Sequence, residues 1–207
     1  MSLIISPYRF AGGGVVVARW NPADNGPFMT LSGGNATLTG PVGTGWSSCR
    51  SVTSHSSGKW YAENEIAINT AGHQVLGIAL STATLTNFVA SDNLGWSIQN
   101  DINNTMRGTG AQMSGAGLVA PVAGERNMLA LDMDTDPSFH LLWLGSKGSW
   151  PGGGDPATAA NPTFKIAKTG QAFYLAASLF SSGMSSAVKN QAGENAHTLP
   201  AGFAMFG

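Results

Sequence analysis

The chain has 207 residues, of which 43% are hydrophobic and only 10% are charged. Ten Lys and Arg against eleven Asp and Glu leave a net charge of −1, which excludes the basic surface that nucleic-acid binding requires. The single cysteine, Cys49, excludes an internal disulfide and a cysteine-based zinc site. Six Trp, nine Phe and three Tyr are too many for a disordered chain.

The first 45 residues differ in pattern from the rest. Residues 1–10 are a short, apolar, strand-like piece, and residues 11–14 are a glycine-rich break. Residues 30–39 read as one strand that a Gly-Gly pair interrupts. We therefore predict an N-terminal arm, or an extra strand layer, over residues 1–45 and a core domain over residues 46–207.

Strand signals recur through the core domain, whereas amphipathic helix signals are nearly absent. The alternation over residues 59–68 places apolar side chains on one face, with Asn64 as the misfit, and Glu63 and Glu65 on the other. Further strands are predicted over residues 74–80, 128–133, 139–144 and 173–180.

Turn-forming clusters separate these strands, at residues 55–58, 91–93, 109–110, 135–137 and 151–156. The Asp136-Pro137 pair predicts a hairpin tip, because aspartate accepts backbone hydrogen bonds in turns and proline presets the backbone. Many short strands between such turns indicate an all-β sandwich or barrel.

Membrane insertion is not expected. The stretch of residues 169–188 has no charged side chain, but it contains Gln171 and five serines. It therefore falls short of the apolar run of about 20 residues that a spanning helix needs.

Metal and cofactor sites are not expected either. Asp132, Asp134 and Asp136 resemble the start of a calcium loop, but Pro137 and Trp143 stand where that loop needs Gly and Glu. We interpret the three aspartates as a polar strand face that leads into a hairpin. The four histidines have no ligand spacing, and no phosphate-binding or nucleophile motif is present.

One pair of carboxylates carries a remote catalytic hypothesis. Glu63 and Glu65 lie two residues apart on one strand face, which is near the separation of the two carboxylates in glycoside hydrolases. Charged residues are common on solvated strand faces, so we expect no catalytic residue here and keep a glycan hydrolase only as a distant alternative.

The tryptophans favour recognition more strongly. Trp46, Trp96 and Trp150 lie in or beside predicted loops, among Asn, Ser, Thr and Gly. An aromatic face beside adaptable polar groups is typical of glycan or protein recognition. The alternative is that these side chains close the open ends of a sandwich, because tryptophan is usually largely buried.

Eight segments of the core domain resemble, in the same order, the strand and loop motifs of SPRY (B30.2-like) domains. They are SGKWYAE (57–63), VLGIAL (75–80), LGWSI (94–98), MLALDMD (128–134), LWLGSKGSW (142–150), GDPA with NPTF (154–157 and 161–164), FYLAASLF (173–180) and LPAGF (199–203). The last two loop motifs, GDPA–NPTF and LPAGF, most resemble the SPRY-like domains of tailed bacteriophages and prophages.

The chain departs from the family pattern in places. Family members usually have Phe, Ser and Asn at the positions of Leu144, Gly145 and Lys147, and their late strand differs from residues 187–190. These are strand-compatible or turn positions, so the fold is expected to survive, whereas a binding surface on those loops need not be shared.

The resemblance implies a bent two-sheet antiparallel β-sandwich, of the concanavalin-like jelly-roll type, that binds partners through its loops without catalysis. Our first hypothesis is a virion surface protein of a tailed phage, a fibre or spike component that recognises host glycan or protein through Trp96, Trp150 and Asp155. The alternative is a decoration protein that reinforces the capsid. Either would contact other virion proteins through residues 1–45, on the particle surface, as an expected homo-oligomer.

Overall fold

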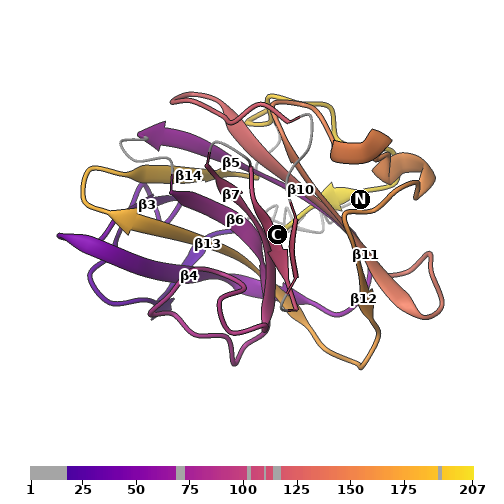
Figure 1. The fold of residues 1–207 in the computed structure, drawn as a ribbon, viewed down its shortest axis with the longest axis horizontal. Helices are drawn as coiled ribbons and strands as arrows, with labels where there is room; N and C mark the ends of the chain where they lie inside the picture. Colours follow the sequence, from indigo (N-terminus) through magenta and orange to yellow (C-terminus); the bar gives the residue numbers. More distant parts are fainter. Residues whose placement is uncertain (1–17, 69–72, 102–103, 110, 114–117, 191–192) are drawn as a thin grey trace, which may run out of the picture.

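The structure is a computed structural model that describes residues 18–68, 73–101, 104–109, 111–113, 118–190 and 193–207. Within these ranges the regular structure consists of β-strands and two short 3-10 turns, so the predicted all-β class is confirmed (Figure 1). No helix in these ranges has the length and apolar character of a membrane span. The elements are β1 (Trp20–Asn25), β2 (Thr30–Ser32), β3 (Thr37–Thr39), β4 (Thr44–His55), β5 (Lys59–Ile68), β6 (Gln74–Ala79), β7 (Gly95–Asn100), β8 (Met106–Gly108), β9 (Ala111–Met113), β10 (Arg126–Asp132), β11 (Phe139–Ser146), η1 (Pro151–Gly153), η2 (Pro156–Thr158), β12 (Phe164–Ala167), β13 (Phe173–Ser181), β14 (Ser185–Lys189) and β15 (Ala204–Met205).

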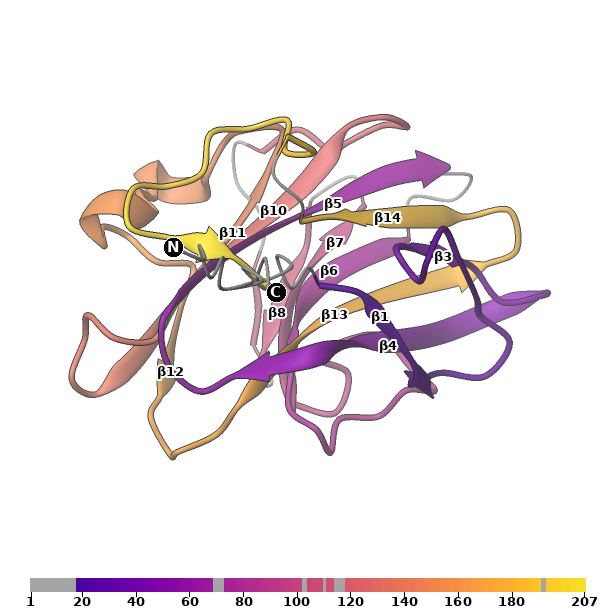
Figure 2. The same ribbon diagram turned by 180° about the vertical axis from the view of Figure 1, so that it is seen from behind.

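The strands form two antiparallel sheets that pack face to face (Figures 1 and 2). Sheet A has the strand order β1-β4-β13-β6-β7-β8-β9, and sheet B has the order β12-β11-β10-β5-β14-β3-β2. The exception to antiparallel pairing is β15, which runs parallel to the beginning of β5 at Trp60 and Tyr61. The predicted two-sheet sandwich is thereby confirmed.

The predicted strands of the core domain are all present. The strand predicted over residues 59–68 is β5 without change, and those predicted at β6, β10, β11 and β13 differ at their ends by at most two residues. The hairpin tip between β10 and β11 forms where Asp136 was expected to make it. Its carboxylate accepts hydrogen bonds from the backbone N–H groups of Ser138 and Phe139, at 2.8 and 3.0 Å.

The longest strand, β4, was not predicted. Its sequence is rich in Ser and Thr and has no alternating apolar pattern. It lies between β1 and β13, and Ser47, Ser48 and Ser51 are almost completely buried there. A strand whose backbone is paired on both sides can use small polar side chains, which leave no hydrophobic periodicity to read.

The described part of the N-terminal region contributes strands to both sheets. Residues 18–45 contribute β1 to sheet A and the β2–β3 hairpin to sheet B, and the predicted boundary at 45/46 lies inside β4. Trp20 is fully buried in the main core. This part of the predicted arm is therefore integral to the sandwich, because its strands extend both sheets. Residues 1–17 lie outside the described residues.

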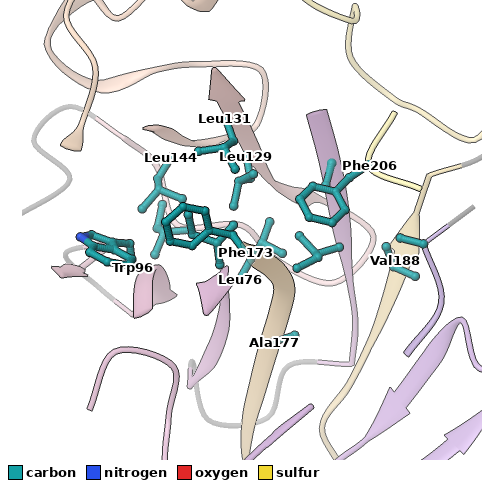
Figure 3. Packing of buried hydrophobic residues seen from close by; sticks show 14 of the residues in the cluster. Leu76, Trp96, Leu129, Leu131, Leu144, Phe173, Ala177, Val188 and Phe206 are labelled. Carbon is teal, nitrogen blue, oxygen red and sulfur yellow. The ribbon is translucent and has the colours of Figure 1, made fainter. Parts of the chain in front are cut away.

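The main core fills the space between the sheets (Figure 3). Strand alternation directs one side chain in two inward, so β5 contributes Ala62 and Ile66 and β13 contributes Phe173 and Leu175. Each fully buried Ile, Leu or Phe side chain stabilises the fold by about 1.5–3 kcal/mol relative to exposure. Asn64, the misfit of the predicted pattern, also points inward, opposite Asn127 on β10, and both are buried.

The outer face of each sheet is covered as well. On sheet A the loop of residues 80–94 packs Ala83 and Val89 against β6 and β13. On sheet B the segment of residues 193–203 packs Phe203 against Tyr61 and Trp143, beside the loop that carries η1 and η2. These coverings place several loops directly over the strands, where side chains from distant parts of the sequence meet.

Candidate functional site

Trp96, predicted as a ligand-binding residue, lies in the core instead (Figure 3). Its ring meets Phe173 edge to face, with centroids 5.7 Å apart. It also packs so closely on Gly108 that a Cβ there would lie 2.1 Å from Trp96 Cδ1. The alternation of β7 directs Trp96 inward, so proximity to a loop in the sequence did not give it exposure. It is not available to a ligand.

Trp150 and Asp155 share one loop on the outer side of sheet B. Trp150 is half-buried and immediately precedes η1, where its ring lies over Gly145. Asp155 precedes η2 and accepts hydrogen bonds from Ala157 N at 3.0 Å and Thr158 Oγ1 at 2.8 Å. The two residues therefore have different roles, because Trp150 presents a surface whereas the Asp155 carboxylate holds its own loop.

Glu63 is the most completely engaged charged side chain of this face. It is fully buried, and its carboxylate accepts four hydrogen bonds. The donors are Tyr61 OH at 2.8 Å, Arg126 Nη1 at 2.7 Å, Ala196 N at 2.9 Å and His197 N at 2.9 Å. Glu63 thus ties the polar segment of residues 194–197 to the middle of sheet B.

Glu65 lies next to this anchor on the same face of β5, as predicted. It forms ion pairs with Arg126 at 3.3 Å and Lys189 at 3.6 Å. The hydrolase hypothesis required both carboxylates to reach a substrate, and Glu63 has no exposed surface with which to do so. Burial together with contact to Glu63 raises the pKa of the Tyr61 phenol, so this hydroxyl stays a hydrogen-bond donor.

Two hollows flank the anchored segment. The first, which we call the aromatic hollow, has a volume of about 310 Å³ and is lined by Tyr61, Met128, Gly148, Trp150, Ala196, His197 and Thr198. The second, which we call the charged hollow, also has a volume of about 310 Å³ and is lined by Gly124, Glu125, Arg126, Lys147, Ala196 and His197. Ala196 and His197 line both, so the segment that Glu63 fixes is the wall between them.

The turn after β11 closes the two hollows from the other side. Ser146 and Ser149 exchange two backbone hydrogen bonds of 3.0 Å, which leaves Lys147 and Gly148 as a two-residue hairpin turn. Both turn residues have positive φ, 53° and 78°. A Cβ at Gly148 would lie 3.0 Å from His197 Nδ1, so glycine lets the imidazole lie close over the turn.

A second group of aromatic side chains lies on the outer face of sheet A. Trp46 contacts His73, Phe88 and Phe180 edge to face, with centroid distances of 5.3 to 5.9 Å, and all four are partly exposed. Arg107 lies over the Phe88 ring, 5.0 Å from its centroid. We did not predict this group, because its members come from two strands, the residue before β6 and the covering loop.

A third hollow, of about 650 Å³, lies at the edge of sheet B next to β12. Its lining comes from the β10–β11 hairpin tip, β11, β12 and the loop between η2 and β12, and comprises Thr135, Asp136, Pro137, Leu141, Ala159, Asn161, Pro162, Thr163 and Lys165. Asp136 and Lys165 are the charged side chains of this wall. No aromatic side chain contributes to it.

The aspartates of the calcium-like pattern hold the hairpin together. Asp132 Oδ1 accepts hydrogen bonds from the backbone N–H groups of Asp134 and Thr135, both at 3.0 Å, and its Oδ2 pairs with Lys59 at 3.0 Å. The described residues contain no cluster of three or more side chains suited to a metal ion. Cys49 is buried, and burial raises the pKa of its thiol to about 12, which leaves it unreactive.

Comparisons with known proteins agree on the fold. No protein-family model matches the sequence, and no curated protein matches it significantly. Among solved structures, the SPRY domain of human HERC1 is similar with a TM-score of 0.63 and 17% identity over 82% of this chain and 96% of that one. A human SPRY domain gives 0.57 and 12% over 78% and 94%, and the TRIM65 PSpry domain gives 0.56 and 12% over 85% and 93%. The chain therefore has a SPRY-like fold.

Proposed function

We propose that this chain is a non-enzymatic recognition module on the surface of a tailed-phage particle, where it binds a host-surface glycan. The observation that carries the proposal is the aromatic hollow, where the half-buried Trp150 ring lies beside the imidazole of His197 and the exposed Thr198. A sugar ring is recognised by an aromatic face together with neutral hydrogen-bonding groups, and this hollow offers both.

Two further features support this proposal. The chain carries few charges and many small polar residues, which suits a particle surface exposed to the medium. The GDPA–NPTF loop, which follows Trp150 directly in sequence, is also one of the segments that most resemble phage-type SPRY domains.

The alternative is a decoration protein that reinforces the capsid and has no ligand. The burial of Trp96 favours this alternative, because it removes one of the three aromatic side chains expected near the loops. Trp46 and Trp150, which keep exposed surface, favour recognition. Under either function the chain contacts other virion proteins through its N-terminal region.

The experiment that tests the proposal is a cryo-EM map of the purified particle combined with a glycan array probed with the purified chain. A position at a tail tip or spike, together with binding to a host glycan, supports recognition. Density that lies across capsomers, together with a silent array, supports decoration. A chain without residues 1–14 is expected to fold and to be missing from purified particles.

A further inference from the structure

The two hollows on sheet B differ in chemistry and share a wall. The aromatic hollow has Trp150 and Thr198 at its surface, whereas the charged hollow contains Glu125, Arg126 and Lys147. His197 lines both. A ligand that extends over this wall would meet a ring-stacking surface on one side and charged groups on the other.

The cation that a ligand can reach is Lys147 rather than Arg126. Arg126 is bound to Glu63 at 2.7 Å, to Glu65 at 3.3 Å and to the backbone carbonyl of Glu194. Lys147 has one ionic partner among the described residues, Glu125 at 2.7 Å. Both side chains of that pair are about one-third exposed. An exposed ion pair contributes little to stability, so another carboxylate can replace Glu125.

Lys147 also occupies a position that disfavours it. The two-residue turn needs positive φ at both central residues, which Asn and Gly adopt readily and Lys does not. A residue other than Gly, Asn or Asp is strained in this conformation. Lysine at a position where asparagine would relieve the strain indicates that its ammonium group has a use, and that group lies in the charged hollow.

We propose that the two hollows together bind a sugar residue that carries a carboxylate, of the uronic acid or sialic acid type. The sugar ring lies against Trp150, its hydroxyl groups bond to Thr198 and His197, and its carboxylate displaces Glu125 from Lys147. This inference rests on the proposed glycan recognition and names the class of glycan. The carboxylate would bind in the charged hollow, of which a neutral sugar would make no use.

The test compares two probes that differ at one carbon, methyl β-D-glucuronide and methyl β-D-glucoside, titrated into the isotope-labelled full chain and followed by NMR. We expect the glucuronide to bind at least about tenfold more tightly, because a hydrogen bond to a charged group contributes about 1.5–3 kcal/mol. The largest shifts are expected at the amides of residues 147–150 and 196–198.

Three variants locate the carboxylate. Lys147→Asn suits the turn, so it is expected to fold and to weaken glucuronide binding about tenfold, with no effect on the glucoside. Glu125→Gln removes the competing carboxylate and is expected to tighten glucuronide binding. Lys165→Asn is the matched control, because it removes the same charge from the 650 Å³ hollow and is expected to change nothing.

Each contrary result has a distinct meaning. Equal binding of the two probes overturns the acidic-sugar inference and leaves glycan recognition intact. Loss of glucuronide binding in Lys165→Asn but not in Lys147→Asn overturns the site, because the carboxylate then lies in the other hollow. If neither probe binds, the inference fails for uronic acids. A glycan array that responds only to neutral glycans rejects the acidic-sugar inference entirely. An array with no response rejects the proposed function as well.

Discussion

On the outer face of each sheet, a buried charged side chain holds the loop that covers the strands. The charge is positive on sheet A and negative on sheet B. On sheet A the buried Arg50 donates hydrogen bonds to the carbonyl oxygens of Leu80 and Ala83, at 3.2 and 2.6 Å, and so holds the beginning of the 80–94 loop. On sheet B the buried Glu63 accepts hydrogen bonds from the N–H groups of Ala196 and His197. A cation fixes a loop through its carbonyls, and an anion fixes a loop through its N–H groups.

The comparison shows how a covering loop can be fixed without apolar side chains at the point of attachment. Loops carry unpaired backbone groups that must be satisfied when they are buried. A charged side chain on a strand satisfies two of them at once with strong hydrogen bonds. Each charge keeps a partner, Asp24 for Arg50 at 2.7 Å and Arg126 for Glu63 at 2.7 Å, so neither is buried alone.

The two faces differ in how well water can replace the hydrogen bonds of the buried charge. Glu63 is entirely buried, whereas Asp24, the partner of Arg50, keeps a quarter of its side chain exposed. Loss of the anion on sheet B should therefore leave backbone donors without substitutes, while loss of the cation on sheet A leaves a carboxylate that water can reach.

Glu63→Ala is expected to have the largest effect, a loss of roughly 3–5 kcal/mol in the free energy of unfolding. The substitution leaves the Ala196 and His197 N–H groups and the Arg126 guanidinium without their acceptor. Chemical denaturation measures the loss, and limited proteolysis should cut first within residues 193–198. Glu65→Ala is the control on the same strand face and is expected to cost less than 1 kcal/mol. Equal effects of the two variants would show that the segment is not held by Glu63.

Arg50→Met is expected to cost less, roughly 2–3 kcal/mol, because the aliphatic stem is retained and Asp24 can be hydrated. Denaturation of this variant beside Glu63→Ala measures the difference between the two faces directly. A loss as large as that of Glu63→Ala would remove the distinction drawn from the exposure of Asp24.

Acid is expected to weaken the layer between the sheets through His140. This side chain is buried against Phe173, and burial, followed by the nearby Lys168, lowers its pKa below the ordinary value of 6.5. The unfolded chain therefore binds a proton that the folded chain does not, so stability is complete above pH 6.5 and declines as the pH falls from there toward the lowered folded-state pKa. The slope is at most about 1.4 kcal/mol per pH unit for this residue.

Melting temperatures of the wild type and His140→Gln between pH 7.5 and 5.5 measure this effect. The variant should lose part of the pH dependence, and the remainder should come from His55, whose pKa is also lowered by burial. A variant with an undiminished slope would show that His140 is not the group that titrates.

The smallest predicted effect is a gain. Lys147→Asn relieves the positive φ of the turn and is expected to stabilise the chain by about 0.5–1 kcal/mol. Thermal unfolding beside Lys147→Ala, which keeps the strain and removes the same charge, separates the turn from the ion pair. If both variants destabilise the chain equally, the pair with Glu125 matters more than the turn.

The fold was predictable where apolar side chains alternate and unpredictable where they do not. β5, β6, β10, β11 and β13 have clear apolar patterns and were placed to within two residues. β4 was missed because its neighbours, rather than its own side chains, make it a strand. Eight weak motifs in the expected order indicated the SPRY-like fold. The order of segments along the chain is kept when individual residues have diverged.

The site was predictable only in part, because the contacts that form it are distant in sequence. The position of Glu63 and Glu65 on the same face of one strand was predicted correctly. The burial of Glu63 was not predicted, since the covering segment lies more than 125 residues downstream and is polar. Trp150 is partly exposed, as recognition requires, whereas Trp96 is buried. The alternation of a strand decides whether a tryptophan side chain points inward or outward, and a nearby turn in the sequence does not.

The hydrogen bond from Ala18 N to Phe206 O, 3.2 Å long, joins the two ends of the described domain. Phe206 N in turn donates to Tyr61 O at 2.8 Å, so both ends meet beside the start of β5. The described domain therefore comes close to a closed ring between residues 18 and 206. A short linker between these ends and a new opening at the exposed Thr135–Ser138 tip would give a circular permutant in which every strand keeps its neighbours. The sandwich is defined by which strands touch and not by the point at which the chain starts.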